Sequence, residues 1–186
     1  MPQLGFRLDL SRCVGCRACE VACRQEMNTV HGVRYRQVLE RQGGEFPNPR
    51  RLFVSIACNH CAEPACMKAC PRGAISKDPT WGIVLIDQER CVGCRYCAAV
   101  CPYGAPQFNP ATGKTEKCTL CVHRVLTKDR KALTGYKPAC VATCIGKALE
   151  FVTDMGEPAE PDPSNFADRK MTRPAIEFRW GWETPW

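Results

Sequence analysis

Hydrophobic and polar residues follow short-period patterns next to the cysteines of this chain. They alternate along residues 5–10, and an apolar run covers residues 83–86. Each pattern predicts a short β-strand that leads into a cysteine-rich loop. The turn-forming pairs Asp78-Pro79 and Trp81-Gly82 indicate a hairpin between Ile75 and Ile83.

Short helices are predicted inside the cysteine-rich loops. In residues 18–23 and 96–101 two cysteines are four positions apart, which places them on one face of a helix. The predicted fold class is therefore α+β, with brief elements of both kinds. The run at residues 83–86 is far shorter than the roughly 18 apolar residues that indicate a membrane span, so no direct span is expected. Because Arg7 and Asp9 interrupt the start of the chain, no signal peptide is expected either.

The high cysteine content indicates that something besides an apolar core stabilises this fold. The 186 residues include 16 cysteines, which supply part of the 45% hydrophobic content. The remaining apolar side chains would form a small core, and small cores offset chain entropy poorly. Disulfides, structural zinc or iron–sulfur clusters must add stability. The expected lack of a signal peptide disfavours a disulfide framework, which is typical of secreted chains.

The cysteines form four groups of four, and none is left over. Residues 12–23 (RCVGCRACEVAC) and 90–101 (RCVGCRYCAAVC) are identical at eight of twelve positions, which indicates a duplicated module. The four groups are Cys13, Cys16, Cys19 and Cys23; Cys58, Cys61, Cys66 and Cys70; Cys91, Cys94, Cys97 and Cys101; and Cys118, Cys121, Cys140 and Cys144.

The third group forms a complete iron–sulfur motif. Its spacing, Cys-x2-Cys-x2-Cys-x3-Cys-Pro, is that of bacterial two-cluster ferredoxins, in which the fourth cysteine binds the other cluster of the pair. Three closely spaced thiolates wrap one cubane, and the fourth points from a short helix toward a second cubane. The second group has the same plan, with a longer gap that contains Glu63 and Pro64.

Charge and the remaining motifs favour electron transfer. The formal net charge of +7 would suit an anionic partner such as nucleic acid. Four oxidised clusters with their thiolates would contribute about −2 each, so the basic residues are interpreted as compensating the clusters, and no nucleic acid is expected. The sequence contains no Ser-His-Asp set, dinucleotide-binding GxGxxG or phosphate-binding loop. We therefore expect no catalytic residues and no enzyme activity of the chain by itself.

Together the motifs resemble those of the four-cluster ferredoxin-like subunits of the molybdopterin oxidoreductase family, such as dimethyl sulfoxide, polysulfide and thiosulfate reductases. The resemblance covers nearly the whole chain, through CVGCRACEVAC, CNHCAEPACMKACPRGAI, DQERCVGCRYCAAVCPYGAP, KCTLC, CVATC and TRPAI. It implies four [4Fe–4S] clusters that relay single electrons between a molybdopterin catalytic subunit, with Mo or W, and an integral membrane subunit that reacts with quinone. Membrane association would come through these partners, on the cytoplasmic or the periplasmic face.

The resemblance also implies which cysteines share a cluster, because in this family the first group pairs with the fourth and the second with the third. Iron would be bound in two interlocked bacterial-ferredoxin-like modules, an outer module of residues 1–30 and 116–150 and an inner module of residues 57–115. The implied ligand sets are Cys13, Cys16, Cys19 and Cys144 (cluster 1); Cys58, Cys61, Cys66 and Cys101 (cluster 2); Cys91, Cys94, Cys97 and Cys70 (cluster 3); and Cys118, Cys121, Cys140 and Cys23 (cluster 4).

Two segments lack cysteine: an insert, residues 31–56, and a C-terminal tail, residues 151–186. Two interpretations are open. Both segments wrap the chain's own modules, or they dock partner subunits, for which Arg and Trp are favoured anchors. The residues concerned are Arg34, Arg36, Arg41, Arg50, Arg51, Trp180, Trp182 and Trp186.

Four residues lie close in sequence to the expected ligands. Arg17, Arg95 and Lys147 are candidates to raise the reduction potential of a cluster, because a cation stabilises the negative charge gained on reduction. His60 lies between Cys58 and Cys61. Since every ligand position already has a thiolate, we expect His60 to pack or to form a hydrogen bond rather than to bind iron.

Two alternative functions use the same cysteines. A stand-alone soluble polyferredoxin would bind the same clusters, but a freely diffusing carrier has little use for large docking surfaces. A structural zinc protein would also use Cys-x2-Cys pairs, although the close spacing within each group suits a cubane better. The colour of the purified protein distinguishes brown iron–sulfur clusters from colourless zinc.

Overall fold

The computed structural model describes residues 2–164 and 166–181. Its elements are short and mix both types, as expected for an α+β chain. In order they are β1 (Gly5–Asp9), α1 (Ala18–Met27), β2 (Arg36–Gly43), β3 (Arg50–Ala57), α2 (Ala65–Lys68), β4 (Ile75–Lys77), β5 (Val84–Ile86), α3 (Tyr96–Ala99), β6 (Gln107–Asn109), β7 (Lys114–Glu116), α4 (Val122–Val125), α5 (Ala139–Ala142), β8 (Leu149–Val152), the 3-10 helix η1 (Arg169–Met171) and β9 (Ile176–Arg179).

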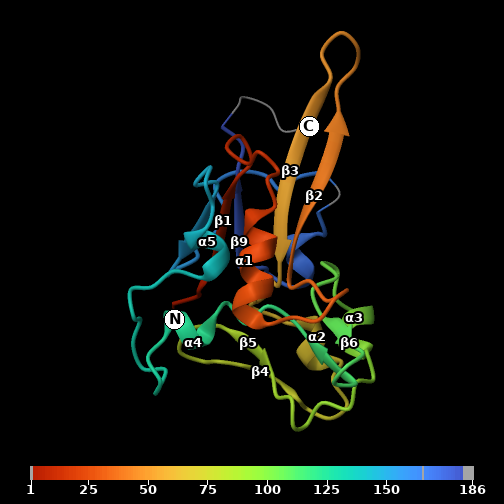
Figure 1. Cartoon of the computed structure of the whole chain (residues 1–186), viewed down its shortest axis with the longest axis vertical. Coiled ribbons are helices and arrows are strands. Elements are labelled where there is room, and N and C mark those ends of the chain that lie inside the picture. The colour runs from red at the N-terminus through yellow and green to blue at the C-terminus, as the bar shows by residue number, and fades with distance from the viewer. Residues whose placement is uncertain (1, 165, 182–186) are drawn as a thin grey trace.

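A three-stranded sheet has β1 at its centre (Figure 1). β1 pairs antiparallel with β8 and parallel with β9. Phe6 and Leu8 of β1 pack with Ile176 and Phe178 of β9 in the main core. The strand predicted at residues 5–10 is thus confirmed, and the tail supplies one of its neighbours.

The structure of the tail distinguishes in part between wrapping of the chain's own modules and docking of partner subunits. Besides the pairing of β9, Trp180 is 1% exposed, and its indole Nε1 donates to the carbonyl oxygen of Pro161 at 2.8 Å. This part of the tail therefore wraps the chain's own core, and Trp180 is not a surface anchor. Trp182 and Trp186 lie outside the described residues.

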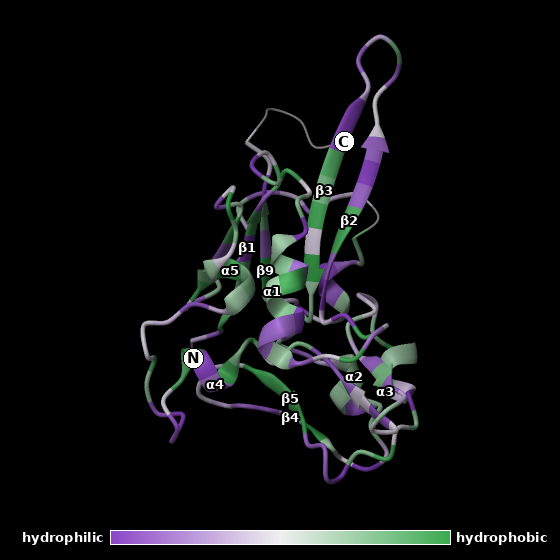
Figure 2. Ribbon diagram, viewed as in Figure 1, coloured by the Kyte–Doolittle hydropathy of each residue, from purple (hydrophilic) through white to green (hydrophobic). Residues whose placement is uncertain are grey.

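The insert forms a long hairpin of β2 and β3, which pair antiparallel from Arg36–Ala57 to Gly43–Arg50. Its base is buried, with Val38 and Val54 each 6% exposed. Its far end projects beyond the body of the molecule (Figure 1), and the outer halves of both strands are hydrophilic (Figure 2). No pattern in the sequence predicted this hairpin.

The hairpin predicted between Ile75 and Ile83 is confirmed by the pairing of β4 with β5. The carboxylate of Asp78 closes the turn. It accepts hydrogen bonds from the backbone N–H groups of Thr80 and Trp81, both at 2.9 Å. Gly82 follows with a φ of +70°, a conformation that favours glycine.

The two predicted helices differ in length. α1 extends beyond Cys23 to Met27, whereas α3 is one turn that ends at Ala99. Cys101 lies after α3, because Pro102 disfavours helical conformation in the residue before it. α1 packs against α5, and α2 packs against α3. In the part of the chain that the structure describes, no helix is long and apolar enough to cross a membrane.

Candidate iron–sulfur sites

Three cavities are each lined by four cysteines, together with largely apolar surroundings. We name them by their cluster numbers: cavity 1, cavity 2 and cavity 3. Their volumes, including space open to solvent, are about 380, 370 and 320 Å³. The cysteines are Cys13, Cys16, Cys19 and Cys144 in cavity 1; Cys58, Cys61, Cys66 and Cys101 in cavity 2; and Cys70, Cys91, Cys94 and Cys97 in cavity 3.

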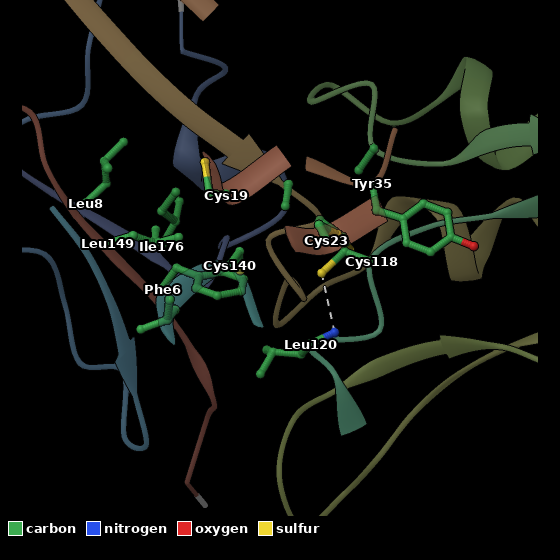
Figure 3. Close-up of a cluster of buried hydrophobic side chains, with 14 of the residues drawn as sticks. Phe6, Leu8, Cys19, Cys23, Tyr35, Cys118, Leu120, Cys140, Leu149 and Ile176 are labelled. Carbon is green, nitrogen blue, oxygen red and sulfur yellow. Dashed lines mark hydrogen bonds between the residues drawn. The ribbon is translucent and has the colours of Figure 1, made fainter. Parts of the chain in front are cut away.

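The remaining four cysteines, Cys23, Cys118, Cys121 and Cys140, are all buried. Burial, together with the nearby Cys140 and Cys121, raises the pKa of the Cys23 thiol to about 12, although Arg36 acts to lower it. Burial also raises the pKa of Cys118 well above its usual value, with Cys23 and Cys140 close by. Figure 3 shows Cys23 and Cys118 side by side in the core. We call these four the core cysteine group.

The duplicated motif folds in the same way twice. Gly15 and Arg17 have positive φ, as do Gly93 and Arg95 at the matching positions. A Cβ on Gly15 would lie 2.6 Å from the ring of Phe53, and one on Gly93 would lie 2.1 Å from the carbonyl oxygen of Gly113. The loop therefore requires glycine at this position for both conformation and space.

Backbone N–H groups point at the cysteine sulfurs. Ala74 donates to Cys70 Sγ at 3.3 Å, and Leu120 donates to Cys118 Sγ at 3.3 Å. Thr115 donates to Cys91 Sγ at 3.5 Å. Such bonds stabilise negative charge on sulfur and are one of the means by which a protein tunes cluster potential. Cys19 Sγ also lies 3.4 Å from Ser55 Oγ.

The donor chemistry fits iron–sulfur clusters. Each group offers four sulfurs, the soft ligands that these clusters prefer. Burial raises the pKa of Cys66 to about 12 and of Cys61 to about 11, so these thiols need bound metal to become thiolates at neutral pH. Within the described ranges, no three His, Cys, Asp or Glu side chains gather closely enough to hold a single metal ion.

The four residues that lie close in sequence to the expected ligands differ in burial and in their contacts. Arg17 lines cavity 1, and Arg95 lines cavity 3 with its guanidinium 3.8 Å from the ring centre of Phe108. Lys147 is exposed. His60 is fully buried, and its Nδ1 accepts the backbone N–H of Val84 at 3.0 Å, which confirms the expectation of a hydrogen bond.

Two buried cations near the cysteines were missed from the sequence. Lys117 is 3% exposed, lines cavity 2, and donates to the carbonyl oxygens of Val84 and Cys118. Arg36 is 2% exposed and lies among the cysteines of the core group. From the sequence it was open whether the insert that contains Arg36 wraps the chain's own modules or docks a partner, and the burial of Arg36 favours wrapping at this residue. One signal was present, since Arg36 shares its alternating strand face with Val38.

Comparison with known families matches two 4Fe-4S dicluster domains, over residues 50–154 and residues 12–75. The chain belongs to the 4Fe-4S dicluster family, and its two domains with sixteen cysteines bind four [4Fe–4S] clusters. The predicted cofactors are thereby confirmed, and the fold comprises two ferredoxin-like dicluster domains.

The chain also resembles whole curated proteins. It is 42% identical to one chain of the anaerobic dimethyl sulfoxide reductase of Escherichia coli, over 80% of this chain and 73% of that protein. It is 36% identical to one subunit of the sulfite dehydrogenase of Allochromatium vinosum (87% and 72%) and to one subunit of the selenate reductase of Mesobacillus selenatarsenatis (81% and 60%). Within the dicluster class, the chain is an iron–sulfur electron-transfer subunit of the molybdopterin oxidoreductase family and is not the catalytic subunit.

Proposed function

We propose that this chain relays single electrons between a molybdopterin catalytic subunit and a membrane subunit that reacts with quinone. The observation that carries the proposal is the gathering of all sixteen cysteines into four groups of four. Each cluster, when bound, accepts and returns one electron. The chain's own cysteines would hold the clusters at fixed positions relative to one another.

The proposed ligands are the cysteines of cavities 1, 2 and 3 for clusters 1, 2 and 3, and the core cysteine group for cluster 4. Support comes from the exchange of cysteines between groups. Cavity 1 takes Cys144 from the fourth sequence group, and the core group takes Cys23 from the first. Cavity 2 takes Cys101 from the third group, and cavity 3 takes Cys70 from the second.

The same exchange supports two interlocked modules. The outer module would comprise residues 1–30 and 116–150, and the inner module residues 57–115. The packing of α1 on α5 joins the two parts of the outer module, and the packing of α2 on α3 lies within the inner one. The pairing of β1 with β8 adds a second link between residues 1–30 and the neighbourhood of residue 150.

Neighbouring groups suggest the order of the relay as clusters 1, 4, 2 and 3. Cys140 lies close enough to Cys19 for its charge to act on that thiol, which links clusters 1 and 4. Cys58 acts in the same way on Cys118, which links clusters 4 and 2. Cys16 and Cys94 are exposed, in cavity 1 and cavity 3 respectively. The two ends of the proposed relay thus reach the surface, where partners exchange electrons.

We assign partner contact to the far end of the β2–β3 hairpin rather than to its base. Arg41, Arg50 and Arg51 are exposed there, and Phe46 is 94% exposed. An exposed aromatic ring among arginines is typical of an interface anchor. Membrane association would come through such partner subunits.

Anaerobic affinity purification of the chain from its native cell tests the proposal. Mass spectrometry of the co-purifying subunits is combined with metal analysis for iron, molybdenum and tungsten. A stoichiometric large subunit containing Mo or W is expected. An iron-rich brown chain that emerges alone would instead indicate a free polyferredoxin.

A further inference from the structure

Arg36 is a buried cation with few partners. Its Nη1 donates to the carbonyl oxygen and Oγ of Ser55 at 3.3 and 3.1 Å. Nε and Nη2 are buried without a hydrogen-bond partner among the described residues. One face of the guanidinium lies over the ring of Phe6, 4.3 Å from its centre. These contacts hold the group in place but supply no negative charge.

A buried guanidinium needs a nearby anion, because neutral acceptors recover only part of its lost hydration. The ion pairs of the described residues include none with Arg36. The buried carboxylate of Glu20 instead accepts the backbone N–H of Val38, two residues further along β2. Among the described residues, the compensating charge therefore comes from groups other than carboxylates.

The groups that can supply it are four cysteines. Burial lowers the pKa of Arg36, but the charges of Cys140, Cys118, Cys19 and Cys23 raise it to a net value above normal. Three of these cysteines belong to the core group, and Cys19 belongs to cavity 1. Arg36 thus lies between the proposed sites of clusters 4 and 1, and only thiolates with bound iron would be anionic there at neutral pH.

We propose that Arg36 raises the reduction potentials of the outer cluster pair, clusters 1 and 4. Each cluster gains one electron and one negative charge on reduction, while Arg36 keeps its single positive charge. The attraction between them is larger in the reduced state, and burial strengthens it. Nε–H and the Nη2 hydrogens are the donors that remain to face the anionic clusters. The proposal rests on the ligand assignment given under Proposed function.

The test is a redox titration of the purified complex, monitored by electron paramagnetic resonance. R36M and R36Q remove the charge, and R36K keeps it. The matched control is R34M, which removes one positive charge from an exposed residue two positions away. We expect R36M and R36Q to shift two of the four midpoint potentials to more negative values. R36K and R34M should leave all four close to wild type.

Unchanged potentials in iron-loaded R36M and R36Q would overturn the proposal, as would an equal shift in R34M or in R36K. If both neutral variants lose iron from the outer pair, retention of that iron in R36K supports the proposal, and its loss in R36K overturns it. The iron content and spectra of the wild-type complex distinguish failure of the proposed function from failure of the role proposed for Arg36. A wild-type chain without four clusters refutes the proposed function, whereas four clusters with potentials indifferent to Arg36 refute this inference alone.

Discussion

At the scale of single residues, backbone conformation and buried charge matter as much as the cysteines. Glycine is required in the duplicated loops because a side chain there would meet Phe53 or the carbonyl of Gly113. The spacing of the cysteines predicted which residues would approach iron. The burial of Arg36 and Lys117 could not be predicted in this way, because an arginine or lysine in an isolated sequence is most often a solvated residue.

Replacing Gly93 by Ala tests the loop requirement. The added Cβ would collide with the carbonyl oxygen of Gly113, and φ at this position is +69°, which strains an L-residue by roughly 1–2 kcal/mol. We expect loss of about four of the roughly sixteen irons per chain, from cluster 3. Iron analysis and electron paramagnetic resonance of the purified complex measure this.

Gly32→Ala is the matched control, because Gly32 has a φ of +88° and nothing within 4 Å of an added Cβ. It should retain all the iron. Equal iron loss in both variants would show that backbone strain, rather than the contact with Gly113, is responsible.

Replacing Cys144 by Ser tests the exchange of ligands. It should change the spectrum or potential of the cluster held by Cys13, Cys16 and Cys19, because Cys144 lines the same cavity. Cys140→Ser, in the same helical region, should instead affect the cluster held by Cys118 and Cys121. Electron paramagnetic resonance of the two variants distinguishes the affected clusters. If Cys144→Ser altered only the second of these clusters, the proposed pairing would be wrong.

At the scale of elements, local patterns predicted β1, β5 and the β4–β5 hairpin well. They failed for contacts that join distant segments. The parallel pairing of β9 with β1 joins Ile176 to Phe6, and no local pattern encodes such a partner. The β2–β3 hairpin was missed because the outer halves of its strands are charged or polar, at residues 40–42 and 50–51, so the alternating pattern ends well before the turn at residues 44–49. Long-range pairing of this kind depends on tertiary packing rather than on propensity.

Phe178→Ala tests whether β9 belongs to the core. Phe178 is fully buried, and removal of such a ring lowers the free energy of unfolding by about 3–5 kcal/mol. The apparent temperature at which the visible cluster absorbance bleaches should fall by about 6–20 °C at a fixed heating rate. Phe46→Ala is the control, since Phe46 is 94% exposed and its loss should change stability by less than about 0.5 kcal/mol. Similar temperatures for the two variants would argue against β9 as a structural strand.

Shortening the β2–β3 hairpin tests its assignment to partner contact. Replacing residues 42–51 by Asn-Gly joins Arg41 to Leu52, which already face each other across the hairpin, through a favoured two-residue turn. Iron content should stay at the wild-type value, because no residue of this segment lines a cavity of cysteines. The catalytic subunit should no longer co-purify with the chain. Undiminished co-purification would show that the hairpin serves only its own fold.

At the scale of the whole molecule, the core and the cofactor sites are one structure. Cysteines supply part of the main core, where Cys19, Cys23, Cys118 and Cys140 pack with the leucines and phenylalanines of the central sheet (Figure 3). The sequence indicated this dependence through its poor content of other core residues. It could not indicate that the insert and the tail would complete the same core.

Removal of iron should therefore unfold the chain as a whole. Anaerobic treatment with a strong chelator is expected to abolish hydrogen-exchange protection in β1, α1 and α5 together, because each packs against the cysteine groups. Mass spectrometry of the exchanging peptides measures this. Retained protection in β1 after complete iron loss would show that the sheet is stable without the clusters.

The exchange of cysteines between distant sequence groups also determines the order in which the cluster sites become complete during synthesis. In the proposed pairing, the inner module has all its ligands once residue 101 has been made, whereas the outer module waits for Cys144 and its sheet waits for β9 at Ile176–Arg179. During that interval the growing chain carries unpaired sulfurs from its first cysteine group. The outer clusters can therefore assemble only after Cys144 has been synthesised, whereas the inner clusters can assemble earlier.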